Sequence, residues 1–123
     1  MQEALAAMGS IVFDVNLLFL IFVTTILGVV IGVLPGLGST TGAALLLPFT
    51  LTMEPVHAIT VLTTIYVSAT FAGSITAILI NTPGTSAAAA TTFDGYPLAQ
   101  RGEAGRALGI AVVASTIGGI FSI

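Results

Sequence analysis

The sequence predicts an all-α integral membrane protein, a polytopic helical bundle whose helices are discontinuous or re-entrant. Only 6% of the 123 residues are charged, whereas 56% are hydrophobic. A domain that faces water carries roughly 25% charged residues, so this surface suits a bilayer. Two uncharged stretches, 15–34 and 57–80, are long enough to cross a membrane, and a proline–glycine interruption follows each.

The composition also excludes several classes of protein. The chain has no cysteine, which excludes disulfides, cysteine-ligated zinc and thiol catalysis. Two basic residues give no electrostatic basis for binding nucleic acid. No Walker A sequence is present, so hydrolysis of a nucleotide by this chain is not expected. Intramembrane proteolysis needs paired aspartates or a Ser/His pair, and the chain has one histidine and no acid inside a span. We therefore expect no enzymatic activity and no metal site.

The first elements are expected to be a lead-in and a span. Residues 1–14 place apolar side chains at helical spacing, which favours a short interfacial helix, although a simple lead-in to the span fits as well. Residues 15–34 form a twenty-residue run without a charge. As a helix this run is ~30 Å long, the thickness of the hydrocarbon core. Gly28 and Gly32 within it predict close helix packing.

A broken or re-entrant segment is expected at 35–53. Pro35 and the glycines that follow it block continuation of the helix. The apolar stretch behind them has eleven residues, 43–53, and contains Pro48. It is too short to cross the bilayer alone.

The second half repeats this order. A span at 57–80 leads into a break and short segment at 81–93, then into a polar loop at 94–106 and the start of a further span at 107–123. The last stretch stops without a polar flank, so we expect the chain to be the N-terminal part of one longer permease domain. Paired broken helices are a pointer to a transporter site near the midplane. Coincidence is the alternative, since the two sets barely align.

Both breaks carry hydroxyl and amide side chains. They are Ser39, Thr40 and Thr41 at the first break, and Asn81, Thr82, Thr85 and Ser86 at the second. A broken helix leaves backbone groups unpaired, its following half offers amides to an anion, and its preceding half offers carbonyls to a cation. The breaks are therefore the predicted site for a substrate or a coupling ion. Ordinary turns at the membrane interface are the alternative.

The few ionisable residues allow narrower expectations. His57 follows Glu54-Pro55 at the start of a span and is expected to be interfacial, with a ligand or proton-relay role as the alternative. Asp94 fits a turn, but it is also a candidate ligand for a coupling ion. Arg101 and Arg106 predict that the loop at 94–106 is cytoplasmic.

Several ordered motifs resemble one family. They are Gly32-Val33-Leu34-Pro35-Gly36-Leu37-Gly38, Leu45-Leu46-Leu47-Pro48, the run from Ala72 to Thr85, Thr92 to Leu98, and Gly102 to Leu108. In these motifs the chain resembles the TctA family, the large membrane subunit of tripartite tricarboxylate transporters, nearly throughout from Asn16. Ala72 stands where glycine is expected, which affects packing more than transport. The resemblance places the predicted site on Pro35, Gly36, Gly38, Asn81, Thr82, Pro83, Gly84 and Thr85.

The resemblance also implies a function. Members are multi-pass permeases of the bacterial inner membrane, about four times as long as this chain. They take up di- or tricarboxylates by secondary transport, driven by sodium or protons, without a cofactor. Their partners are a small TctB-like membrane subunit and a periplasmic TctC-like solute-binding protein. Two alternatives stay open: a membrane scaffold or assembly subunit that transports nothing, and a channel.

Overall fold

The computed structural model describes residues 1–122, without the side chain of residue 11, and every regular element among them is helical. The elements are α1 (Gln2–Phe13), α2 (Val15–Val33), α3 (Gly38–Thr50), α4 (Pro55–Ile80), η1 (Ser86–Ala89), α5 (Thr91–Leu98), η2 (Ala99–Glu103) and α6 (Ala104–Phe121). The prediction of an all-α membrane protein is confirmed.

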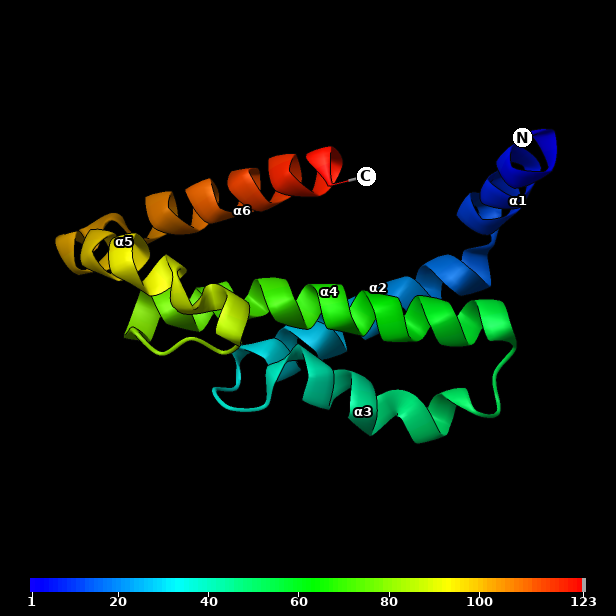
Figure 1. Cartoon of the computed structure of the whole chain (residues 1–123), viewed down its shortest axis with the longest axis horizontal. Coiled ribbons are helices and arrows are strands. Elements are labelled where there is room, and N and C mark those ends of the chain that lie inside the picture. The colour runs from blue at the N-terminus through cyan, green and yellow to red at the C-terminus, as the bar shows by residue number, and fades with distance from the viewer. Residues whose placement is uncertain (123) are drawn as a thin grey trace.

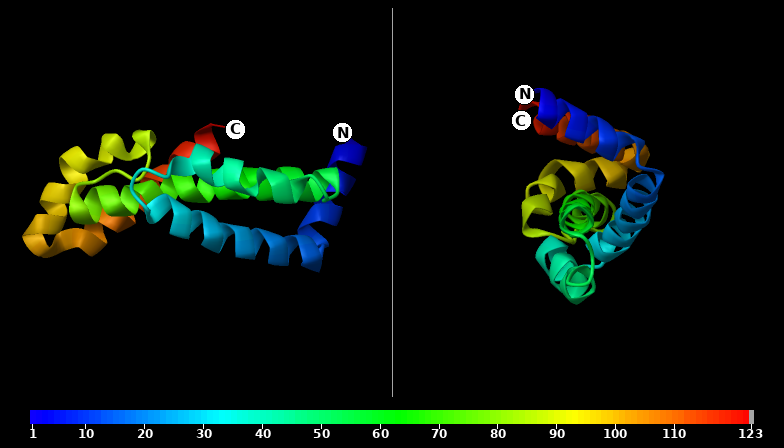
Figure 2. Two further views of the ribbon diagram at one scale, coloured as in Figure 1. Left: turned by 90° about the horizontal axis from the view of Figure 1, so that it is seen from below. Right: turned by 90° about the vertical axis from the view of Figure 1, so that its right-hand side faces the viewer.

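Helix α4 is the centre of the molecule. It contacts α2, α3, η1, α5 and α6, and it supplies most of the buried apolar side chains. Helices α2 and α4 run in the same direction, and α3 returns in the opposite direction beside them (Figures 1 and 2). The buried apolar side chains of α4 are Val61, Ile65, Ala69, Ala72, Ala77 and Ile78.

Small residues bring α2 and α4 together. A Cβ atom added to Gly32 would lie 2.6 Å from the Cα of Ala69, and closer still to its carbonyl oxygen. A Cβ on Gly28 would collide with the hydroxyl of Ser68. The glycines therefore allow backbone-to-backbone contact, and the predicted close packing at Gly28 and Gly32 is confirmed.

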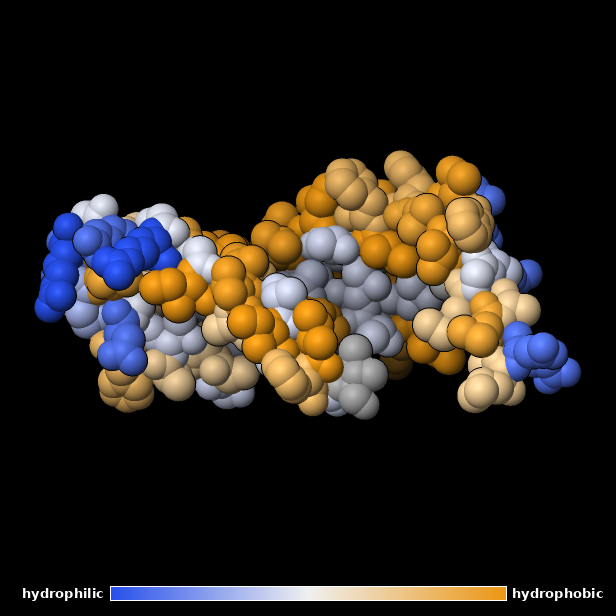
Figure 3. Space-filling view, turned by 90° about the horizontal axis from the view of Figure 1, so that it is seen from above, coloured by the Kyte–Doolittle hydropathy of each residue, from blue (hydrophilic) through white to orange (hydrophobic). Residues whose placement is uncertain are grey.

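Three stretches have the length and composition of a membrane span: Val15–Val33, Pro55–Ile80 and Thr91–Phe121. The last of them is divided by the kink in η2. Figure 3 shows apolar residues over the middle of the molecule, with polar residues gathered near the α5–α6 turn and at the opposite, N-terminal end. This distribution fits a protein that crosses a bilayer between two polar interfaces.

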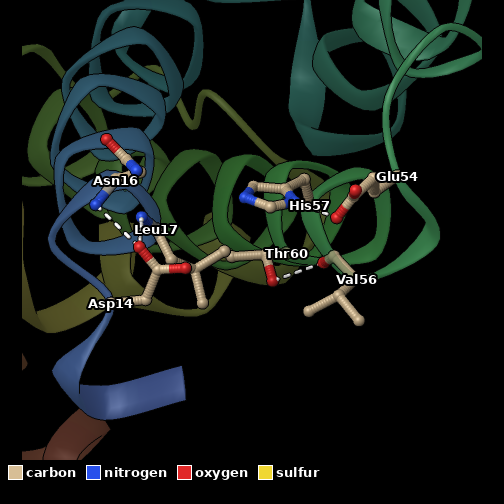
Figure 4. A network of polar contacts seen from close by, with 7 residues as sticks. All are labelled: Asp14, Asn16, Leu17, Glu54, Val56, His57 and Thr60. Atoms are coloured by element: carbon tan, nitrogen blue, oxygen red, sulfur yellow. Dashed lines mark hydrogen bonds and ion pairs between the residues drawn. The ribbon is translucent and has the colours of Figure 1, made fainter. Parts of the chain in front are cut away.

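The polar end near the start of α2 and α4 is ordered by local contacts (Figure 4). The Asp14 carboxylate caps α2 and accepts hydrogen bonds from the amides of Asn16, at 2.9 Å, and Leu17, at 3.4 Å. The Nδ1 atom of His57 lies 3.6 Å from Oε2 of Glu54. Both α2 and α4 begin at this end of the molecule, and the two breaks follow the opposite ends of these helices. His57 therefore lies far from both breaks, which agrees with the prediction that it is an interfacial residue.

Two predicted boundaries are wrong. The segment at 94–106 is largely helical and not a loop, because the chain reverses over Gly102, with φ of 82°, and Glu103, with φ of −102°, and needs no longer connection. The next helix accordingly begins at Ala104 instead of residue 107. The predicted broken segment at 35–53 contains one helix, α3, and Pro48 does not end it: the helix continues to Thr50.

Candidate functional site

The first break separates α2 from α3. It contains Gly36 and Gly38, whose φ angles of 90° and 63° are left-handed, and Pro35 supplies no amide to continue α2. No described side chain caps the start of α3. Among the described residues, the backbone amides of Gly38, Ser39 and Thr40 have no hydrogen-bond acceptor. The first break thus leaves donors unpaired at the amino end of a thirteen-residue helix.

The second break folds back along α4. Asn81 ends the helix in the left-handed conformation, with φ of 57°, and turns the chain. The Thr82 amide donates to Thr76 O at 3.3 Å, and the Gly84 amide donates to Gly73 O at 3.2 Å. These bonds hold an extended stretch of chain against α4, short of its end.

The two breaks meet at Gly84. A Cβ atom on this glycine would collide with the carbonyl oxygen of Gly32 and lie 2.9 Å from the Cα of Gly73. Gly32 is in the last turn of α2 and Gly73 is in α4. The sequence thus brings three backbones together at one point by omitting side chains there.

This meeting point lies within the length of α4, one of the three candidate spans. Gly73 is ~27 Å along α4 from Pro55 and ~10 Å from Ile80, at 1.5 Å per residue. If α4 crosses the bilayer, irregular backbone at this level must be buried in protein or must line a cavity.

A cavity is present at this level. Its volume is about 420 Å³, and its walls come from both breaks: Gly36, Leu37, Gly38, Thr40, Thr41, Pro83, Gly84, Thr85 and Ser86. The structure brings six of the predicted site residues to this cavity: Gly36, Gly38, Thr40, Pro83, Gly84 and Thr85. We refer to it as the break cavity.

The remaining predicted residues have other positions. Pro35, Ser39, Asn81 and Thr82 do not line the break cavity. Asp94 lines a separate cavity of about 300 Å³ between α4, α5 and α6, which Ser74, Thr91 and Ser115 also line. Any role of Asp94 with a coupling ion would therefore be played outside the break cavity. No group of three or more His, Cys, Asp or Glu that could hold a metal occurs among the described residues.

Thr85 differs from the other buried threonines. It is 8% exposed, and its Oγ1 atom is buried without a hydrogen-bond partner in the part of the chain that the structure describes. By contrast, Thr76 Oγ1 donates to Gly73 O at 3.3 Å, and Thr24 Oγ1 donates to Leu20 O at 2.7 Å. A buried hydroxyl without a partner costs about 1–3 kcal/mol. This one lies against α4, where a Cβ atom on Gly73 would be 2.7 Å from it.

Three wall residues were not in the predicted site. Thr41 and Ser86 carry hydroxyls of the two breaks, but their spacing does not distinguish them as site residues in the way that Thr40 and Thr85 are predicted to be. Leu37 is apolar, and nothing in the sequence marks it. Its position follows only from the turn that joins α2 to α3.

Comparison with known proteins fits this arrangement. The model of the family described as "Tripartite tricarboxylate transporter TctA family" matches residues 18–123. The chain belongs to the TctA family. Both breaks and both cavities lie inside the matched residues of this TctA-family chain.

A curated relative from Agrobacterium vitis is 49% identical to this TctA-family chain over 98 residues, which is 80% of the chain and 20% of the relative. It is described as "Uncharacterized 52.8 kDa protein in TAR-I ttuC' 3'region". The chain thus spans about a fifth of the length of that relative. No solved structure matches the chain.

We predict that Asn81 matters because it adopts the left-handed backbone conformation at the end of α4. Replacing Asn81 with valine places a β-branched residue at φ of 57°, which is expected to destabilise the protein by about 1–2 kcal/mol. Asn81→Gly, which removes the same amide without that strain, should be close to neutral. Thermal unfolding of the full-length protein in detergent measures both. Equal losses in the two variants would show that the amide group itself is required.

Proposed function

We propose that this TctA-family chain is part of a permease that takes up di- or tricarboxylates across the bacterial inner membrane by ion-coupled secondary transport. The observation that carries the proposal is the convergence of two proline–glycine breaks on one cavity, within the length of a membrane-spanning helix. The family description supports tricarboxylate as the cargo class. Sodium and protons are the two candidate driving ions.

Broken helices suit this task because they offer backbone groups without charged side chains. The end of α2 presents carbonyls, which suit a cation, and the start of α3 presents amides, which suit an anion. No lysine or arginine lies within α2, α3 or α4. Binding of a carboxylate in this part of the protein would therefore depend on amides, hydroxyls and helix dipoles.

The separate cavity at Asp94 is the candidate place for the coupling ion. Its carboxylate and the nearby hydroxyls of Ser74, Thr91 and Ser115 are oxygen groups of the kind that a small cation binds. A TctC-like solute-binding protein would deliver the cargo, and a TctB-like subunit would complete the membrane complex.

Transport by the full-length protein tests the proposal. The protein is reconstituted in liposomes with its membrane partner, and the binding protein and radiolabelled citrate are added outside. We expect saturable uptake that requires an inward sodium or proton gradient. A scaffold would give no uptake, and a channel would give uptake that neither saturates nor needs the gradient.

A further inference from the structure

We propose that the Asp94 cavity and a neighbouring cavity form one water-filled crevice between α4 and α6, which holds a small cation at Asp94 and admits it to the middle of the membrane. This inference rests on the proposed function in taking that cation to be the coupling ion. It depends on the continuity of the two cavities, the charge of their walls, and the hydroxyl side chains along them.

The Asp94 cavity adjoins a second cavity of about 370 Å³. Ser74 of α4, Thr91 of α5 and Ser115 of α6 line both of them. The second cavity extends along α4 past Thr70 to Tyr66. Helices α4 and α6 run in opposite directions on its two sides (Figure 1). We refer to the two cavities together as the polar crevice.

The polar crevice runs from one polar end of the molecule to the middle of α4. Asp94 lies beside the last turn of α4, because a Cβ atom on its neighbour Gly95 would lie 2.7 Å from Cγ1 of Ile78. Polar residues gather at this end, near the α5–α6 turn (Figure 3). At 1.5 Å per residue, Tyr66 is ~21 Å from the carboxyl end of α4 and ~17 Å from its amino end. If α4 crosses the bilayer, the polar crevice reaches about halfway across it.

The charge of the walls favours a cation. Asp94 is exposed, and it is the one charged residue among those that line the two cavities. No ion pair joins it to a basic side chain in the described part of the chain. A carboxylate at membrane depth needs water or a positive partner, because burying it alone is costly. An anion in the polar crevice would meet this negative charge and no positive one.

Hydroxyl side chains continue the polar crevice inward from Asp94. They belong to Ser74, Thr91, Ser115, Thr70 and Tyr66. The hydroxyl of Thr70 donates to Tyr66 O at 2.7 Å, so its remaining capacity is that of an acceptor. Hydroxyls that bond back to their own helix are tolerated against lipid, whereas a carboxylate is not. The carboxylate therefore indicates water in the crevice, and the hydroxyl oxygens then suit a hard cation that keeps part of its hydration shell.

Labelling of single thiols tests whether the polar crevice contains water. This chain has no cysteine, so Ser115→Cys is introduced into the full-length protein after any cysteines elsewhere in it are replaced by serine. The protein is placed in lipid nanodiscs, which expose both faces of the membrane to the cationic thiol reagent MTSET. We expect Ser115→Cys to be labelled at least about tenfold faster than Thr116→Cys, because a thiol in water ionises and one in lipid does not.

Thr116 is the matched control position. It is the next residue of α6 and also an exposed hydroxyl residue, but it lines neither cavity. Equal labelling rates at the two positions would show that water reaches α6 from every side and would overturn the inference. Absence of labelling at Ser115→Cys would overturn it as well, because another part of the full-length protein would then fill the polar crevice.

The same thiol tests the part played by Asp94. After correction for their rates with a free thiol, cationic MTSET should label Ser115→Cys at least about tenfold faster than anionic MTSES, because the carboxylate concentrates cations. Adding Asp94→Asn should bring this ratio close to one, and Asp94→Glu should preserve it. Sodium chloride, compared with choline chloride at equal ionic strength, should slow MTSET labelling unless Asp94→Asn is present. A ratio and a sodium effect that both persist in Asp94→Asn would overturn the inference.

These measurements do not depend on uptake, so their failure would overturn the inference and leave the proposed function intact. If labelling behaves as expected but the reconstituted protein takes up no carboxylate, the polar crevice stands as a cation site and the proposed function fails.

Discussion

Replacing Gly84 with alanine is expected to reduce carboxylate uptake at least about tenfold, even though the change adds a single methyl group. That methyl would collide with the carbonyl oxygen of Gly32 and lie 2.9 Å from the Cα of Gly73. Both neighbours are backbone atoms, which cannot rotate away as a side chain can. The second break would have to move off α2 and α4, and the walls of the break cavity would separate.

The uptake assay described above measures this effect, together with the amount of protein in the membrane. Gly84 does not have a left-handed φ, so alanine brings no conformational strain there and the result reports on packing alone. Gly105→Ala, at a position in α6 with no atom near its added Cβ, is the control and should transport like wild type. Normal uptake by Gly84→Ala would mean that the close approach of the two breaks has no part in transport.

Replacing Gly32 with leucine is expected to have the largest effect on stability, because it acts on the contact between α2 and α4. Even a Cβ here would lie 2.6 Å and 2.8 Å from two backbone atoms of Ala69. Overpacking of this kind costs about 1–3 kcal/mol and occasionally more, and a leucine inside a helix–helix contact belongs at the upper end. We expect a fall of several degrees in the unfolding temperature of the full-length protein, and a lower yield from the membrane.

Gly109→Leu is the comparison for this prediction. Gly109 also lies inside a long apolar helix, but nothing lies within 4 Å of its added Cβ. The same substitution should therefore leave the unfolding temperature nearly unchanged. Similar losses at both positions would show that leucine disturbs these helices for a reason other than the contact with Ala69.

The helical breaks could be found from local sequence because proline and glycine act on their own backbone. Pro35 removes a donor wherever it stands, and Gly36 and Gly38 permit left-handed dihedrals that other residues rarely adopt. The predicted breaks after residues 34 and 80 agree with the ends of α2 and α4. The prediction of a loop at 94–106 is wrong, because polar residues are compatible with a helix there and two residues, Gly102 and Glu103, are enough to reverse it.

Sequence patterns alone determined that this is an all-α membrane protein, which family it resembles, and where its helices are interrupted, because composition, spacing and the local effects of proline and glycine decide these properties. Only the tertiary structure decided that the two interruptions share one cavity, that Asp94 lies in another, and that Thr85 is left without a partner. The first of these relations joins residues more than forty positions apart. They depend on how α2 and the second break pack against α4, and no local preference records that packing.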